Sequence, residues 1–402
     1  MTTAIYLRIF QGFFMQDTIL FISHYAGRTG APLMLLNLLK WLKENTPLSF
    51  EVLLLADGPL RAEFASLAPV NFFPGAPVPE GKAARLARRL GLAEDESKSR
   101  EKLLYRLRES GIGLIYANTV VTGRALEALA PLGCPVITHI HELDYWIEQS
   151  GEENLQQVRR HTGRYIAASR TVKQNLVDRY GISAGKIDVV HSFIPARGVA
   201  ADPEGIRQRL GIPEEAFVVL GSGHETWRKG KDLFVLLAAQ AKKTMPEMQA
   251  HLLWVGGWQK DEDRRNILHD IRHLGLEGKV HFTGEVSNPL DYFAAGDVFA
   301  MVSREDPFPL VCLEAAALGK PVLCFADSGG MPEFVEDDAG FVVPYLDLAA
   351  MAERIAALAV DTTLRARLGK RAAEKVCGMY DIAAGSKRIE RIISKIICSQ
   401  SA

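Results

Sequence analysis

Short apolar runs alternate with stretches of helical periodicity along the first half of this chain. Strand-like apolar runs occur at 18–23, 50–55, 113–117, 135–140, 164–168 and 187–191. Between them, apolar residues recur every three or four positions, which predicts helices at 33–43, 82–90, 102–109, 122–130 and 171–179. The alternation of strands and helices predicts an α/β fold in which a parallel sheet is covered on both faces.

The same pattern starts again in the second half. Strand-like runs follow at 217–220, 251–255, 280–283, 297–302, 321–325 and 340–343, and residues 192–202 between the two sets are rich in small and turn-forming residues. We therefore predict two Rossmann-like domains, 16–192 and 193–375, and a C-terminal segment, 376–402, with helical spacing at 382–397. Open parallel sheets bind ligands outside the carboxyl ends of their strands, so a site is expected in a cleft between the domains.

Composition places the chain among ordinary globular proteins. It has 402 residues, 48% of them apolar and 24% charged, and its net charge of −1 gives no reason to expect nucleic acid as a partner. No run reaches the ~18 apolar residues that span a bilayer. The cysteines form no Cys-x-x-Cys pair, which favours reduced thiols in the cytoplasm over disulfides or a zinc site. They are Cys134, Cys312, Cys324, Cys377 and Cys398.

The first residues of the chain do not resemble a signal peptide. Residues 1–14 are too short and too interrupted by polar residues, and no small-residue cleavage site follows them. We interpret Met15 as the natural start and residues 1–14 as an upstream extension. A weak interfacial anchor is the alternative.

Two carboxylates mark the segment 303–322. Asp306 and Glu314 stand on either side of a Phe-Pro-Leu-Val turn, and the helical run that carries Glu314 ends at Gly319, with Pro321 just beyond. Glu314 is the only charge on this otherwise apolar helix. Because an unpaired carboxylate on a buried helix is costly, Glu314 requires a partner, which could be the hydroxyls of a ligand or a buried group of the protein.

Glycine-rich and basic loops supply candidate anion sites. The loop 25–32, which contains Gly30, follows the first strand and opens a helix, so it is either an anion-binding turn or a plain strand-to-helix connection. Arg228 and Lys229 precede the helical run 233–242, where they could clamp a diphosphate or form a solvated turn. The run 221–226 departs from the dinucleotide fingerprint at Thr226, which disfavours an NAD-dependent enzyme.

Histidines end the strand-like run 135–140. His139 and His141 stand where ligands of parallel sheets bind, so His141 either hydrogen-bonds a sugar or is an ordinary satisfied histidine. No third ligand with suitable spacing appears, which argues against zinc. The Asp-x-Asp at 261–263 opens a helix within a mixed-charge run, and we interpret it as a solvated first turn.

Taken together, these motifs resemble glycosyltransferase family 4, the retaining glycosyltransferases of group 1 with the GT-B architecture. The resemblance extends from Ile19 to Ala357 and is strongest between Val280 and Glu333. There a Thr-Gly-x-Val loop, a strand, the carboxylate pair and a Ser-Gly-Gly-Met-Pro-Glu run follow in order. The architecture implies two Rossmann-like domains facing across a cleft, with a C-terminal helix that crosses back to the first domain.

The resemblance assigns roles to the two carboxylates and the cations. It implies that Glu314 accepts the ribose hydroxyls of a nucleotide and that Asp306, at a position that normally carries Glu, contacts the sugar. Lys229 matches the lysine that binds the diphosphate. An arginine is usual six residues earlier, where this chain has Gly223. Arg228 or His224 would compensate, and the remaining implied donor-binding and acceptor-side residues are Gly30, His141, Val286, Phe308, Pro309, Leu310 and Val311.

The implied activity is transfer of a hexose-like sugar from a nucleoside diphosphate sugar to a glycan or lipid-linked acceptor. The implied setting is cell-surface polysaccharide or glycolipid synthesis in the cytoplasm, with peripheral association at the inner face of the membrane as an alternative. Cations and backbone amides would stabilise the leaving diphosphate without a metal or a further cofactor. Two alternatives remain: a sugar-nucleotide epimerase of the same fold, and a non-catalytic GT-B partner subunit in which Gly223 and Asp306 mark lost activity.

Overall fold

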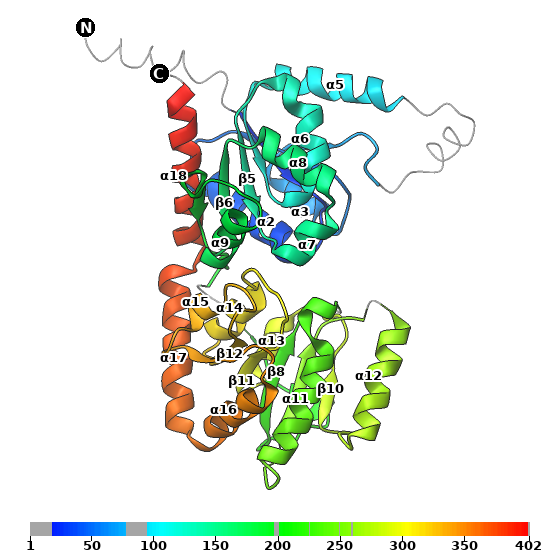
Figure 1. Ribbon diagram of the computed structural model, residues 1–402, viewed down its shortest axis with the longest axis vertical. Coiled ribbons are helices and arrows are strands. Elements are labelled where there is room, and N and C mark those ends of the chain that lie inside the picture. The colour runs from blue at the N-terminus through cyan, green and yellow to red at the C-terminus, as the bar shows by residue number, and fades with distance from the viewer. Residues whose placement is uncertain are drawn as a thin grey trace. The chain divides into compact units, whose positions relative to one another are not determined.

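The computed structural model describes residues 18–77, 95–196, 201–224, 226–248, 250–258 and 260–400 (Figure 1). The chain divides into two compact units. Unit 1 comprises the chain up to Ala168, Lys173–Val190 and the residues from Ser386 onward, and unit 2 comprises Ser169–Val172 and His191–Gly385.

Unit 1 is built on a seven-stranded parallel sheet with the order β3-β2-β1-β4-β5-β6-β7. The central strand β1 is buried from Ile19 to Ser23 and pairs with β2 on one side and β4 on the other. A strand covered on both faces reads as a continuous apolar run, as this one does. The strands are β1 (Thr18–Ser23), β2 (Phe50–Leu54), β3 (Val70–Phe72), β4 (Ile112–Ala117), β5 (Val136–Ile140), β6 (Arg164–Ala167) and β7 (Ile187–Val189).

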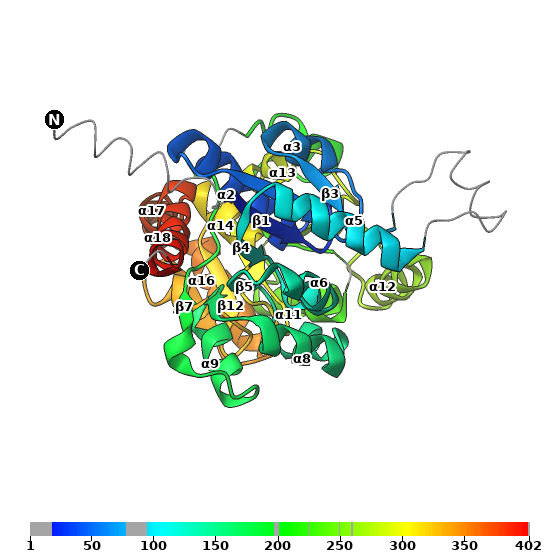
Figure 2. The ribbon, with the colours of Figure 1, turned by 90° about the horizontal axis from the view of Figure 1, so that it is seen from above.

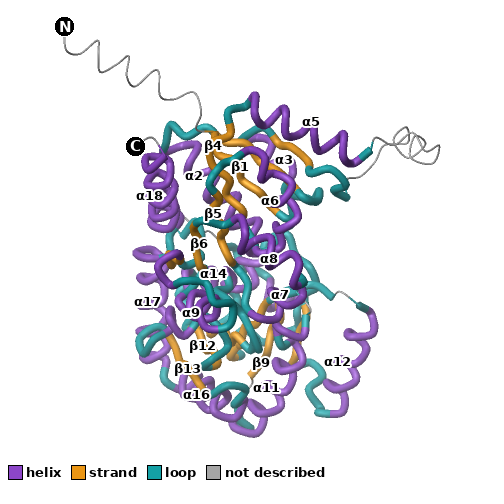
Figure 3. The backbone as a smooth tube through the Cα atoms, turned by 45° about the horizontal axis from the view of Figure 1, so that its top comes forward, coloured by secondary structure: helices purple, strands orange, loops and turns teal. Residues whose placement is uncertain are grey.

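Helices flank the strands of unit 1, as the view from above and the backbone tube show (Figures 2 and 3). In α2, buried leucines and a methionine recur at helical spacing and form the face that packs on the sheet. The helices are α2 (Gly30–Asn45), α3 (Arg61–Leu67), α5 (Glu96–Glu109), α6 (Gly123–Leu129), α7 (Asp144–Gln149) and α8 (Glu152–His161), with α9 (Arg170–Asp178) and α18 (Ile382–Gln400) beginning in unit 2.

Unit 2 contains a six-stranded parallel sheet with the order β10-β9-β8-β11-β12-β13. Its strands are β8 (Phe217–Ser222), β9 (Ala250–Val255), β10 (Val280–Phe282), β11 (Val298–Met301), β12 (Val322–Phe325) and β13 (Gly340–Val343). Its helices are α10 (Ile206–Arg209), α11 (Lys231–Thr244), α12 (Asp261–His273), α13 (Pro289–Ala294), α14 (Leu310–Ala317), α15 (Pro332–Val335), α16 (Leu348–Val360) and α17 (Thr362–Met379). A short 3₁₀ turn, η4 (Trp227–Lys229), precedes α11.

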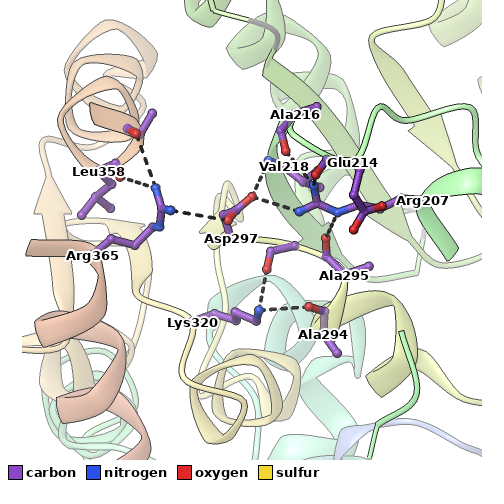
Figure 4. Close-up of polar contacts among 12 residues, drawn as sticks. Arg207, Glu214, Ala216, Val218, Ala294, Ala295, Asp297, Lys320, Leu358 and Arg365 are labelled. Atoms are coloured by element: carbon purple, nitrogen blue, oxygen red, sulfur yellow. Dashed lines mark hydrogen bonds and ion pairs between the residues drawn. The ribbon is translucent and has the colours of Figure 1, made fainter. Parts of the chain in front are cut away.

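A charged network fixes the amino edge of the unit 2 sheet (Figure 4). Asp297, just before β11, lies between two guanidinium groups: its carboxylate is 3.3 Å from Arg207 and 3.8 Å from Arg365. Lys320 donates to two backbone carbonyls between α13 and β11, at 3.0 and 2.5 Å. Because these cations are held by carboxylate and carbonyl oxygens within the unit, the network has a structural role.

The expected α/β fold with two Rossmann-like parallel sheets is confirmed, and a strand is present at every predicted position. Strand β3 was not predicted, and α5 begins at Glu96, six positions before the expected start. The predicted helix 82–90 and residues 1–14 lie outside the described residues, as does part of the expected linker. Among the described residues, no helix is both long and apolar enough to cross a membrane.

Candidate functional site

The loop that follows β11 holds Asp306 at the carboxyl edge of the unit 2 sheet. The backbone N–H of Asp306 donates to the carbonyl of Ser328 at 2.7 Å, and Gly330 N–H donates back to the carbonyls of Asp306 and Pro307. A Cβ at Gly329 would lie 1.8 Å from the Asp306 carbonyl oxygen, and its φ of 129° is one that side chains rarely allow. The Ser-Gly-Gly run therefore clamps the backbone of Asp306 in place.

The carboxylate of Asp306 is paired inside the protein. Its Oδ2 lies 2.5 Å from Nζ of Lys229 and 3.4 Å from Nη1 of Arg228, and Ser303 Oγ is 3.5 Å away. Asp306 is only 4% exposed. Burial alone would raise the pKa of Asp306, but the charges of Lys229 and Arg228 and their hydrogen bonds hold it below its usual value.

Arg304 holds in place the turn that carries Arg228 and Lys229. Arg304 makes a bidentate pair with Asp232 at 2.9 and 2.6 Å, and it donates to the carbonyl of Trp227 at 2.8 Å. Its backbone N–H donates to the carbonyl of Arg228 at 2.7 Å. The turn ends at Gly230, which has a φ of 71° and approaches the Val302 carbonyl so closely that a Cβ would lie 2.2 Å from it. Sequence reasoning did not identify Arg304.

Gly223, which replaces the arginine usual in the family, lies under the stem of Lys229. A Cβ at Gly223 would be 3.1 Å from Cγ and Cδ of Lys229, and the φ of Gly223 is 153°. Its carbonyl accepts from Trp254 Nε1 at 3.1 Å. Two residues were suggested as substitutes for the arginine that is usual at position 223. Arg228 forms an ion pair with Asp306, whereas His224 is exposed.

The start of α14 points unsatisfied backbone groups toward the same edge. No side chain caps this helix, and no acidic residue stands in its first turn. The first N–H groups of a helix lack intrahelical partners, so those of Leu310 and Val311 can bind an anion. Pro309 has no N–H, so within this segment it cannot contribute a backbone amide to the donor.

Phe308 and Val286 lie at the carboxyl edge of the unit 2 sheet, where both are at least partly buried. Phe308 is buried and stacks on Tyr380, with ring centroids 5.5 Å apart, and its ring contacts the tilted ring of His191 at 4.9 Å. Val286 is partly buried in the loop after β10, two residues beyond Gly284, which bridges to the end of β9. Both residues lie at the carboxyl edge of the unit 2 sheet, where the sequence placed them.

Glu314 has no hydrogen-bond or ion-pair partner in the part of the chain that the structure describes. It stands in the second turn of α14, on the helix whose other residues are apolar. Burial raises the pKa of Glu314 to about 7. The alternative of a buried protein partner is therefore not realised among the described residues, and a ligand hydroxyl remains as the partner that would satisfy this carboxylate.

Glu333, at the end of the Ser-Gly-Gly-Met-Pro-Glu run, is held by hydrogen bonds within unit 2. It accepts from the backbone N–H groups of Arg170 and Thr171 at the start of α9, at 3.0 and 2.8 Å, and from His191 Nε2 at 2.7 Å. Burial opposes the ionised form, but His191 and the two backbone donors hold the pKa of Glu333 below its usual value. Its hydrogen-bonding capacity is used by the protein.

In unit 1, His141 follows β5 and is held as a neutral imidazole. Its Nε2 is 3.1 Å from Asn118 Oδ1, and its ring lies 4.0 Å from that of His139. Burial, and secondarily His24, lower the pKa of His141 to about 3. Such a side chain can exchange hydrogen bonds with a hydroxyl but carries no charge near neutral pH.

Gly30 is the first residue of α2 and is exposed. A Cβ there would meet nothing within 4 Å, so packing does not demand glycine and the space above this helix start is open.

Within the described residues, no group of three or more acidic, histidine or cysteine side chains is arranged to hold a metal ion. Asp261 and Asp263 lie in the first turn of α12.

One cavity of unit 2 lies at a different place. It has a volume of about 1040 Å³ and is lined by Arg207, Asp297 and Arg365, among others, at the amino edge of the sheet. The residues predicted from sequence for unit 2 are instead grouped at the carboxyl edge, where parallel sheets bind ligands. We therefore take the carboxyl edge, with Arg228, Lys229, Asp306 and Glu314, as the candidate site.

Two family models match most of the chain. Residues 202–375 match the model described as Glycosyl transferases group 1, and residues 29–197 match Glycosyltransferase Family 4. D-inositol 3-phosphate glycosyltransferase of Streptomyces avermitilis is 34% identical over 240 residues, 56% of this chain and 50% of the relative. LpsE, a lipopolysaccharide core biosynthesis glycosyltransferase of Rhizobium meliloti, is 32% identical over 197 residues, 48% of this chain and 54% of the relative. The chain thus spans about half the length of the curated relatives it matches.

Solved structures show the fold. The Anabaena protein HepE, in complex with UDP and glucose, superposes with a TM-score of 0.77 at 23% identity, covering 94% of this chain and 100% of that one. A sucrose-phosphate synthase from Thermosynechococcus elongatus superposes with a TM-score of 0.75 at 20% identity, covering 96% and 100%. These likenesses support the same pair of Rossmann-like sheets.

Proposed function

This chain belongs to glycosyltransferase family 4, with the GT-B pair of Rossmann-like sheets, and we propose that it transfers a sugar from a nucleoside diphosphate sugar to a hydroxyl of a glycan or a lipid-linked acceptor. Transfer would retain the configuration of the sugar. Named glycosyltransferases among its relatives support an enzymatic role in the assembly of cell-surface polysaccharide or glycolipid.

The observation that carries this proposal is the pairing of a cationic turn with an unpartnered carboxylate at one sheet edge. Lys229 and Arg228 stand beside the uncapped start of α14, where a diphosphate would gain two charge-assisted contacts and the helix dipole. Glu314, one turn further along α14, would accept the two ribose hydroxyls. A nucleoside diphosphate offers both features, an anion and a diol, at neighbouring positions.

The same residues fit the chemistry of transfer. The bond between the anomeric carbon and the diphosphate oxygen breaks while the acceptor oxygen bonds to that carbon from the same face. The departing diphosphate oxygen takes the acceptor proton, and its growing charge is stabilised by Lys229, Arg228 and the amides of α14. A neutral His141 would orient hydroxyl groups without adding a charge.

UDP is the first donor nucleotide to test, because similar solved structures of Anabaena HepE hold UDP and UDP-glucose. We would measure thermal unfolding with UDP, GDP and ADP. A nucleotide at one hundred times its dissociation constant stabilises the folded state by about 2.7 kcal/mol. If none of the three raises the unfolding temperature, the proposal fails.

Product analysis separates the proposal from its alternatives. Incubation with a sugar nucleotide alone should release only nucleoside diphosphate and free sugar, slowly, whereas an epimerase would convert the sugar while it remains attached. Addition of glycan and lipid-linked acceptors should then accelerate release of the nucleotide. Tight binding of the nucleotide without any release, across the acceptor panel, would instead identify a non-catalytic subunit. A lipid-linked acceptor would bring the enzyme to a membrane surface.

A further inference from the structure

We propose that Asp306 is a positioning residue, whose carboxylate holds the ammonium of Lys229 and the guanidinium of Arg228 in place for the donor diphosphate and does not touch the sugar. The inference rests on the proposed function, and it reassigns the role that the family resemblance gives to this position. It also links the two departures from the family pattern, Gly223 and Asp306, because both lie against Lys229.

The first support is that one oxygen of the Asp306 carboxylate, Oδ2, is already held by three groups of the protein. Oδ2 alone takes the contacts with Lys229, Arg228 and Ser303, at 2.5, 3.4 and 3.5 Å. With 4% of its surface exposed, Asp306 has little area left for a sugar. A carboxylate that binds ligand hydroxyls would instead lack hydrogen-bond and ion-pair partners in the protein, as Glu314 does among the described residues.

The second support is that the backbone cannot bring Asp306 outward. Its N–H donates to Ser328, and its carbonyl accepts from Gly330 at 3.2 Å. Gly329 approaches that same carbonyl more closely than any side chain would permit. Aspartate has one methylene fewer than glutamate, so its side chain is shorter. With the backbone fixed, the carboxylate of Asp306 therefore stays beside Lys229 and Arg228.

The third support links Asp306 to Gly223. The stem of Lys229 packs 3.1 Å from where a Cβ of Gly223 would stand, so an arginine at 223 would contest that space. Without that arginine, the second cation beside Lys229 is Arg228, which Asp306 Oδ2 and the Glu305 carbonyl hold at 3.4 and 2.6 Å. In this chain the cation beside Lys229 is thus Arg228, and Asp306 is the group that both cations share.

A positioning role for Asp306 predicts a change in nucleotide affinity that a contact with the sugar would not produce. Asp306 competes with the diphosphate for the cations, so Asp306→Asn should bind nucleoside diphosphates more tightly, by about three- to tenfold. The affinity for the sugar nucleotide should rise by the same factor, because the sugar is not involved. Release of the nucleotide from the sugar should slow by about 100-fold, since the cations lose the orientation that the leaving diphosphate needs.

The test is calorimetric titration of the full chain. The probes are whichever of UDP, GDP and ADP stabilises the protein most, and the glucose conjugate of that nucleotide. Wild type, Asp306→Asn and Asp297→Asn are compared. Asp297 is the matched control, because it also sits between two cations of unit 2 but at the opposite edge of the sheet, and its variant should bind like wild type.

The outcomes separate the possibilities. Equal tightening for the nucleotide and its glucose conjugate supports the positioning role. Weakened binding of the conjugate alone means that Asp306 contacts the sugar, and unchanged affinities and rates mean that it does neither; both overturn the inference. If the wild-type chain binds none of the nucleotides, the proposed function itself has failed.

A double variant covers the case in which Asp306→Asn does not fold. Lys229→Met combined with Asp306→Asn leaves neither partner of the closest pair charged. If Asp306 acts through Lys229, the double variant should release nucleotide about as slowly as Lys229→Met alone, because the two effects are not additive. A further large loss in the double variant would overturn the positioning role.

Discussion

Replacing Glu314 by glutamine should stabilise the free protein above neutral pH. Burial raises the pKa of Glu314 from 4.5 to about 7, a difference worth about 3 kcal/mol. The folded pKa exceeds the unfolded one, so the folded state binds this proton more tightly. The stability is therefore fully present below pH 4.5 and is lost as the pH rises from 4.5 through 7. Glutamine removes the charge at nearly constant shape.

The size of the effect follows from the two pKa values. The raised pKa of Glu314 costs the folded state roughly 1 kcal/mol at pH 5 and roughly 3 kcal/mol at pH 8. The free energy of unfolding of Glu314→Gln relative to wild type should therefore grow by roughly 2 kcal/mol between these pH values. Urea unfolding at a series of pH values measures it, and Glu353→Gln, at an exposed glutamate of α16, should show no such trend. A difference that is independent of pH would refute the reasoning.

Binding of a nucleotide should make Glu314 prefer its ionised form over its protonated form. When ribose hydroxyls donate to the carboxylate, the ionised form is favoured, so the wild-type protein should release about half a proton on binding UDP at pH 7. Titration calorimetry in two buffers of different ionisation enthalpy measures this release. Glu314→Gln should bind UDP more weakly and release about half a proton less than wild type. Equal affinities would mean that Glu314 does not hold the ribose.

Three further predictions concern the candidate site and its support. Lys229→Ala should lose most of the transfer activity while the circular dichroism spectrum stays that of wild type, and wild-type turnover would contradict the site assignment. Gly329→Ala should lower the free energy of unfolding by roughly 1–3 kcal/mol in urea, because its Cβ collides with the Asp306 carbonyl. Burial lowers the pKa of His251 to about 4 and lowers that of His281, so the contribution of these histidines to urea stability should fall as the pH drops from 6.5 toward 4. His251→Gln should therefore become more stable relative to wild type as the pH drops over this range.

The strands could be predicted from the sequence because both sheets are covered on both faces. In β9, for example, every residue after the first is buried, and all of them except His251 are apolar. Strand β3 contains only Val70, Asn71 and Phe72, and a polar residue at the centre of three gives no recognisable period. The end of α14 at Ala317, just before Gly319, also followed from local sequence, since the φ of that glycine is 74°.

The contacts of the candidate site could be predicted only in part. Glu314 was visible because a lone charge on an apolar helix is conspicuous. The pairing of Lys229 with Asp306 was not, because 77 residues separate them and only the order of β8 and β11 in the sheet brings them together. Arg304 was missed for the same reason, since its partner Asp232 lies 72 residues away. Periodicity and capping report on neighbours in sequence, whereas these contacts depend on which strands are adjacent.

The two carboxylates that stand eight residues apart have opposite environments, and this contrast divides their roles. Asp306 meets two cations, which hold its pKa below the usual value despite burial. Glu314 meets no charge among the described residues, so burial alone raises its pKa to about 7. A group whose charge the protein already neutralises can shape the site but has little left to offer a ligand. A group that the protein leaves unsatisfied gains the most from ligand hydroxyls, so a nucleotide that binds here should draw its affinity from Glu314 and the orientation of its diphosphate from Asp306.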